Sequence, residues 1–585
     1  MKTVSDLINR LVVKRFFIVM MSGMICSLSA WADISTTSQQ LDDFSFKKGL
    51  TAHGGLTFSN EFYSGSDSLV RRDPYAYFLN GNLNMNLWGI SMPFSFSYSN
   101  TQISYTQPFN KFKLDPSYKW VHLLVGTNTM EMSPYTLSDH EFTGVGVELT
   151  PGKWKIAGMY GRLNKAVEYD PLVNNYNTVA FKRYGYAGMV GYNHEKGEYK
   201  VTFFHGEDDQ NSLHNYIPAE CALTPEKNTA VSASIMQRFL KYFFVKGEYA
   251  FTLFNSNICT DEGVEVQTNS FADRIFRKRI SDKYADAINA ALGYQGKYWG
   301  LSFNFERITP YYSTLGGYYF NNDLMNFTLA PNVKLLNGKL NLSGNFGVQY
   351  NNLDDDKQET TRRLVYSANI AYNSGKAFNT SLSFSNFSTF TKVRPTSYPY
   401  MTNSLDSLNF YQLSRSISSS SSLTFGPEKL KDVLSLTLSY QCANMLTEEK
   451  LTSYSDYYAS NLSFNQQVTP WKMSWSCFGN FNYCDATGME NIYFGPGLLI
   501  SKPFFKDALT TSLSCAYNLN RVLGQEHGSL LNTSLSAAYS IKAANPKFGT
   551  HSFSLNSGYT RFLGEMANGD NQYEFLTTLA YRVSF

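Results

Sequence analysis

The feature that most constrains this chain is an alternation of apolar and polar residues with a period of two, repeated from residue 49 to the end. In residues 339–351, Leu342 and Val348 fall on one face of an extended chain, and Asn341 and Asn345 fall on the other. The same pattern recurs in other long segments: 75–87, 507–520 and 528–541. Strands of soluble proteins are typically about five or six residues long, whereas membrane-spanning β-strands need about ten. The sequence therefore predicts an all-β, transmembrane antiparallel β-barrel.

The connections between these segments support the same fold, because short and long ones alternate. Tight turns are predicted at Pro151-Gly152, Asn337-Gly338 and Ser374-Gly375. The long connections lie near 207–225, 255–283, 309–323 and 390–409. Outer-membrane barrels have this asymmetry, with short periplasmic turns and long extracellular loops. The last strand carries Tyr581, Val583 and Phe585, and this terminal pattern resembles the barrel-assembly signal of outer-membrane proteins.

The number of strands is less regular than the alternation. Roughly 25 segments alternate, while single-chain bacterial barrels normally have an even number of strands. When strands are counted back from Phe585, the tight turns fall on the periplasmic side of the membrane as far as Pro151. The tight turn at Trp88-Gly89 then falls on the opposite side. Either one crossing within 101–140 is miscounted, or part of that segment folds inside the barrel. We predict about 24 strands, within a range of 22–26.

The first 32 residues have the pattern of a cleaved secretion signal. Lys14 and Arg15 precede an apolar stretch, and Ala30-Trp31-Ala32 fits a small-x-small cleavage site. We therefore expect a signal peptide at 1–32, a short periplasmic segment at 33–48 and a single barrel at 49–585, exported to the outer membrane of a Gram-negative cell. The signal contains four basic residues and one acidic residue, which accounts for the net charge of +3 of the whole chain. The mature chain is then nearly neutral, which argues against a nucleic-acid partner.

The polar positions of the strands are rich in Asn, Ser, Thr and Gln and contain few charges. Such a wall stays hydrated and does not select ions strongly by sign. The residues predicted to line the lumen are Asn80, Asn82, Asn84, Asn341, Asn345, Gln349, Ser512, Ser514 and Asn518. A barrel of this size needs something to fill it, and 33–48 is too short for a plug domain, which argues against a plugged, TonB-dependent receptor. Inward-folded loops, the 101–140 segment or a partner protein remain as ways to close the lumen.

Reactive and metal-binding residues are few. Asp139-His140-Glu141 is the densest titratable cluster and the best candidate for a barrel hydrolase, but its alternative is a polar strand end. Glu207-Asp208-Asp209 is predicted to be a solvated loop tip rather than a calcium site. Cys221 and Cys259 fall in two neighbouring loops and are a candidate disulfide, with two free thiols as the alternative. We predict no catalytic residue, no metal and no cofactor.

Three short stretches point to a family of proteins. They are Gln107-Pro108-Phe109-Asn110, Ser133-Pro134-Tyr135-Thr136-Leu137 and 318–323, with the sequence Tyr-Tyr-Phe-Asn-Asn-Asp. Together with the Tyr- and Asn-rich strands, they resemble large, mostly uncharacterised outer-membrane barrels of the Bacteroidota type. The resemblance implies the location and the fold, and it brings no active site or substrate.

Three functions follow from these patterns. The first is a channel or transport barrel for hydrophilic solutes, which the neutral lining favours. The second is a structural or secretion-associated barrel that holds a protein partner in its lumen or on its loops, favoured by Tyr residues in 309–323 and 390–409. The third is a barrel hydrolase. The expected partners are membrane lipid and lipopolysaccharide, the barrel-assembly machinery, and in the second case a protein that occludes the lumen.

Overall fold

The computed structural model describes most of the chain after residue 48. The described residues are 49–66, 72–100, 110–171, 178–218, 221, 223–261, 282–318, 321–355, 362–375, 377–386, 415–447, 450–542, 549–564 and 572–585. The predicted signal peptide, the 33–48 segment and the predicted loop 390–409 lie outside them.

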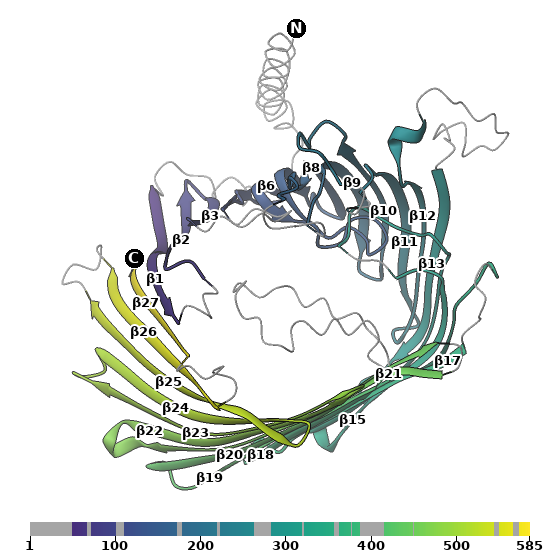
Figure 1. Ribbon diagram of the computed structural model, residues 1–585. Coiled ribbons are helices and arrows are strands. Elements are labelled where there is room, and N and C mark those ends of the chain that lie inside the picture. The colour runs from purple at the N-terminus through teal and green to yellow at the C-terminus, as the bar shows by residue number, and fades with distance from the viewer. Residues whose placement is uncertain are drawn as a thin grey trace, which may run out of the picture. The chain divides into compact units, whose positions relative to one another are not determined.

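The described residues form one antiparallel sheet that closes on itself. The first strand, β1 (Leu50–Gly65), pairs with the last, β27 (Tyr573–Ser584) (Figure 1). In this pairing Phe58 lies opposite Tyr581. The strands between them are β2 (Tyr75–Leu87), β3 (Ile90–Ser99), β4 (Lys111–Leu114), β5 (Ser117–Tyr118), β6 (Val121–Thr129), β7 (Glu141–Leu149), β8 (Trp154–Asn164), β9 (Lys182–His194), β10 (Gly197–Asp209), β11 (Lys227–Phe239), β12 (Phe243–Asn255), β13 (Asp282–Gln295), β14 (Trp299–Ile308), β15 (Leu324–Leu335), β16 (Leu340–Tyr350), β17 (Arg362–Asn373), β18 (Phe378–Ser385), β19 (Arg415–Phe425), β20 (Leu430–Thr447), β21 (Lys450–Val468), β22 (Met473–Ala486), β23 (Met489–Phe504), β24 (Leu509–Val522), β25 (Gln525–Lys542) and β26 (Thr550–Leu563). The predicted all-β antiparallel barrel is confirmed.

The barrel has 26 strand positions among the described residues, which is more than the expected number of about 24 and lies at the upper end of the predicted range of 22–26. Two short strands, β4 and β5, both pair with β3 on one side and with β6 on the other, and they share one position. This crossing was missed in the sequence because pieces of four and two residues carry too little alternation to be recognised. Counting it makes the number of strands even and removes the parity conflict at Trp88-Gly89.

The described chain falls into two units. The smaller one contains residues 49–51 and the turn at 86–90, where the Gly89 N–H donates a hydrogen bond to Asn86 Oδ1 at 3.0 Å. Trp88 and Gly89 both have positive φ angles, of 55° and 97°. The larger unit, 52–85 and 91–585, contains almost all of the barrel wall.

The two faces of the wall differ in chemistry. On β20, Leu434, Leu436 and Leu438 are 38–45% exposed and share one face, while Ser435 and Thr437 lie on the other. In a membrane barrel, exposed apolar side chains face the lipid and the alternate residues face the lumen. We call the face of Ser435 and Thr437 the inner face. Among the described residues, no helix is long and apolar enough to cross a membrane.

Candidate functional site: the inner wall of the barrel

Two connections that are far apart in the sequence pack together on the inner face of β6–β15. They are residues 130–140, between β6 and β7, and residues 309–318, between β14 and β15; we call them together the inner body. The Tyr312 hydroxyl donates to the Tyr135 carbonyl at 2.8 Å, and the Ser138 N–H donates to the Gly316 carbonyl at 2.9 Å. Tyr312 and Leu137 are completely buried. The expectation that part of 101–140 folds inside the barrel agrees with this packing.

Small residues on the inner face make room for the inner body. Ala157 and Met159 on β8, Ala187 on β9 and Phe204 on β10 form one buried cluster with Leu137 and Leu315. Farther along the wall, Ala250, Ala285 and Ala287 pack with Tyr135 and Tyr312. Large side chains at the alanine positions would fill the space that the two segments occupy. This sector of the wall is therefore covered by the chain itself.

Hydroxyl and amide groups of the wall fix the inner body in place. The hydroxyls of Thr136, Thr202 and Ser232 form a chain, with oxygen separations of 3.1 Å and 2.7 Å. Asn228, which is fully buried, accepts the Leu315 N–H at 3.2 Å and donates to the Ser313 carbonyl at 3.4 Å. Such hydrogen bonds favour a single packing of the inner body against the wall, because a buried polar group that loses its partner costs free energy.

Two carboxylates of the inner face hold the edge of the inner body. Glu248 on β12 accepts a hydrogen bond from Ser133, and Glu306 on β14 accepts one from the Tyr135 hydroxyl at 2.9 Å. Asn326 on β15 donates to the second oxygen of Glu306 at 3.0 Å. Burial, together with the charge of Glu306, raises the pKa of Tyr135, so this hydroxyl stays protonated and continues to donate.

Two residues of the Asp139-His140-Glu141 cluster, His140 and Glu141, have structural partners. His140 is 3% exposed, its Nδ1–H donates to the Glu141 carbonyl at 2.9 Å, and its ring stacks on Tyr318 at 4.3 Å. The Glu141 carboxylate pairs with Lys111 at 2.6 Å. These contacts connect the start of β7 to the inner body.

Two of the three motifs that carried the resemblance meet at the inner body, while residues 107–109 of the first motif lie outside the described residues. Residues 133–137 belong to the inner body. The hydroxyl of Tyr318, the first residue of the third stretch, accepts a hydrogen bond from the Glu141 N–H at 3.1 Å. Tyr312, which was predicted to belong to a binding surface, is completely buried. The reason is that its ring packs edge-on against Tyr135, at 6.1 Å and 80°.

The remaining wall carries hydroxyl and amide groups on its inner face. One row of register partners crosses β18 to β23 as Ser383, Ser418, Ser439, Ala459, Asn482 and Tyr493, and the next row crosses as Ser381, Ser420, Thr437, Asn461, Asn480 and Gly495. On β24 and β25, the hydroxyls of Ser514 and Ser534 are 2.6 Å apart. None of the residues in these two rows is charged.

The structure places the predicted lumen residues as follows. Asn80, Asn82 and Asn84 on β2 and Asn341 and Asn345 on β16 are exposed. Ser512 and Ser514 on β24 are half-buried on the inner face. Gln349 and Asn518 are 2% and 5% exposed, so these two are packed into the wall. Whether the exposed positions line a water-filled passage stays a prediction.

Three other predicted groups can be placed. The structure does not join Cys221 and Cys259, which are both free thiols. Asp208 is not part of a solvated loop tip, because its side chain is 2% exposed and receives two hydrogen bonds from Arg183, at 2.7 Å and 2.9 Å. At the end of the chain, Tyr581 and Val583 lie on the closing strand β27, and the Phe585 N–H donates to the Gly54 carbonyl at 3.0 Å.

Comparisons with known proteins add little beyond the fold. No family model matches the sequence, and no curated protein matches it. Among solved structures, the chain is similar to the siderophore receptor PirA from Pseudomonas aeruginosa, at 11% identity over 91% of this chain and 80% of that one, with a TM-score of 0.38. It is also similar to the P pilus usher (PapC) translocation pore, at 8% identity over 92% and 99% of the two chains, with a TM-score of 0.34. A third match, OccAB4 from Acinetobacter baumannii, has 11% identity over 67% and 98% of the two chains and a TM-score of 0.27.

These scores are too low to support an argument about function. The chain is a large antiparallel β-barrel whose fold resembles outer-membrane proteins, and this much comes from its own strand pairing and exposed apolar face. The resemblance to Bacteroidota barrels stays a prediction.

Proposed function

We propose that this protein is an outer-membrane channel that lets hydrophilic, mostly uncharged solutes cross. The observation that carries the proposal is the contrast between two sectors of the inner face. In β6–β15 the inner face is covered by the inner body, whereas from β18 to β23 it presents uncharged hydroxyl and amide groups. Such a wall can exchange hydrogen bonds with water and with neutral polar solutes without selecting ions by sign.

The outer face supports a position in the outer membrane. Exposed Leu, Phe and Tyr side chains recur on it around the sheet, among them Leu438, Leu513 and Phe553. We propose that lipid and lipopolysaccharide contact this face, and that the barrel-assembly machinery inserts the chain through its closing strand with Tyr581, Val583 and Phe585.

Liposome swelling tests the proposed function. The purified barrel is placed in vesicles, and the swelling rate is measured with neutral sugars of increasing size and with anionic and cationic solutes of matched size. We expect the rate to fall with solute size and to depend little on the sign of the charge. Vesicles that do not swell with any solute would overturn the channel and favour a barrel whose lumen holds a protein partner.

A further inference from the structure

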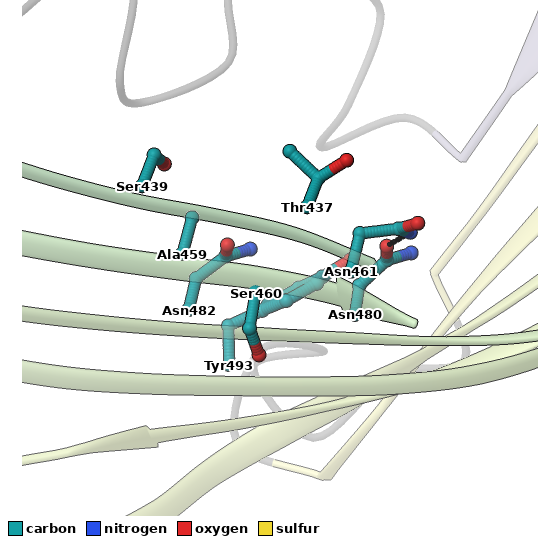
Figure 2. Close-up of a pocket in the computed structure, with 8 residues that line it drawn as sticks. All are labelled: Thr437, Ser439, Ala459, Ser460, Asn461, Asn480, Asn482 and Tyr493. Atoms are coloured by element: carbon teal, nitrogen blue, oxygen red, sulfur yellow. Dashed lines mark hydrogen bonds between the residues drawn. The ribbon is translucent and has the colours of Figure 1, made fainter. Parts of the chain in front are cut away.

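A hollow in the uncharged sector of the inner face has a volume of about 170 Å³ (Figure 2). Eight residues line it: Thr437, Ser439, Ala459, Ser460, Asn461, Asn480, Asn482 and Tyr493. They come from four consecutive strands, β20 to β23, and seven of them belong to the two rows of register partners described above. One lining residue, Ala459, has only a methyl side chain, and this leaves space between the longer side chains of its neighbours.

The aromatic ring of the hollow, that of Tyr493, lies beside Gly495. A Cβ atom at Gly495 would be 3.6 Å from Cε1 of Tyr493 and only 2.0 Å from Oδ1 of Asn518. The Asn518 amide thus occupies the space over the glycine, and the Tyr493 ring lies next to it. In Figure 2 the Tyr493 side chain extends toward Asn461 and Asn480. This arrangement offers a flat apolar surface beside the amide groups.

The polar groups of the hollow are neutral and can both donate and accept. Asn461 donates a hydrogen bond to Asn480, which leaves further amide hydrogens and lone pairs of this pair available. Asn482, Thr437 and Ser439 add an amide and two hydroxyls. None of the eight lining residues carries a charge, so an ionic ligand would lose hydration without gaining a counter-charge.

We propose that this hollow is a subsite that binds one ring of a neutral saccharide on its way through the barrel. A sugar ring has hydroxyl groups that both donate and accept, and an apolar C–H face that can lie on an aromatic ring. The inference deepens the proposed channel function and rests on it, because it names the class of solute that the channel would favour.

Current block by a neutral trisaccharide, maltotriose, tests the subsite. Ala459→Phe places a ring in the hollow, and Ala538→Phe is the matched control, because Ala538 is an exposed alanine on the inner face of β25 outside the hollow. We expect maltotriose to interrupt the ion current of the unchanged barrel and of the control with similar affinity. In Ala459→Phe the apparent affinity should fall by about tenfold or more.

A second variant keeps the test valid if Ala459→Phe fails to fold. Tyr493→Leu removes the aromatic surface with a smaller side chain, and the affinity for maltotriose should fall while the open-channel conductance stays close to that of the unchanged barrel. Glucuronate, which is charged, should block more weakly than glucose.

The outcomes separate the subsite from the channel. Conduction without block by maltotriose, or an equal loss of block in Ala459→Phe and Ala538→Phe, would overturn the subsite and leave the channel standing. If the barrel does not conduct, saturation-transfer NMR on the detergent-purified protein measures maltotriose binding directly. Binding that is lost in Tyr493→Leu would then support the subsite and overturn the channel, and no binding would overturn both.

Discussion

Gly316 packs against residues 136–137 of the other segment of the inner body, so an added methyl group there tests how the two segments are held. A Cβ atom at this position would be 2.3 Å from the Thr136 carbonyl oxygen, well inside the distance of ordinary contacts. Gly316→Ala should therefore push the segments apart. Two hydrogen bonds at the junction would be weakened, from Thr314 Oγ1 to the Thr136 carbonyl at 2.6 Å and from the Ser138 N–H to the Gly316 carbonyl at 2.9 Å.

The expected size of the effect follows from these contacts. Each of the two hydrogen bonds contributes about 0.5–1.5 kcal/mol, and overpacking adds about 1–3 kcal/mol. The inner body should thus be destabilised locally by about 2–6 kcal/mol. Because about 1.4 kcal/mol changes an equilibrium tenfold, the population of the open form should rise by roughly 30-fold or more.

Hydrogen–deuterium exchange of the peptide that covers 130–140 is the assay. We expect faster exchange there in Gly316→Ala, with unchanged exchange in β20–β25, because the wall strands keep their own backbone hydrogen bonds. The control is Gly158→Ala on β8, where a Cβ would lie 3.6 Å from its nearest neighbour, the Ala187 carbonyl oxygen. Unchanged exchange at 130–140, or equal changes in both variants, would refute the proposed packing.

Two further changes probe the same region. Arg183→Met leaves the buried Asp208 carboxylate without its cation and should lower the local stability by about 3–5 kcal/mol. Lys182→Met breaks only a partly exposed ion pair and should lower it by about 1 kcal/mol or less. Equal decreases in the melting temperature of the two variants would contradict this expectation. Burial raises the pKa of Tyr135 and Tyr312, so their contribution to stability is complete below the ordinary tyrosine pKa of about 10 and is lost as the pH rises above it. Hydrogen–deuterium exchange at 130–140 should therefore become faster above about pH 10, beyond the increase that every amide shows with pH. A corrected exchange rate that does not change with pH would argue against buried tyrosine hydroxyls.

Period-two alternation was enough to predict the barrel, because every long strand repeats the same contrast of faces over ten or more residues. The inner body could not be predicted in the same way. Its contacts join residues 177 positions apart, such as Tyr312 and Tyr135, and no local pattern encodes them. One signal was present in the sequence. The inner positions of β8–β13 include Ala157, Ala187 and Ala250, while those of β19–β22 include many Ser, Thr and Asn residues, and this difference marks the covered sector.

The position of polar residues along a strand was predictable, but their exposure was not. Asn518 and Ser514 alternate in the same way on β24, yet Asn518 is 5% exposed because its amide lies over Gly495 of the neighbouring strand. Burial at such a position depends on a cross-strand glycine, which a single strand's pattern does not contain.

The central proposal is that the barrel conducts through a passage along the two uncharged rows of β18–β23. Single-channel recording of the purified barrel in a planar bilayer, with different KCl concentrations on the two sides, tests this most directly. The account predicts stable current steps and a reversal potential close to zero, because the hydroxyl and amide wall does not discriminate between the two ions. A barrel that stays silent, or one whose reversal potential shows strong selection for one ion, would contradict it.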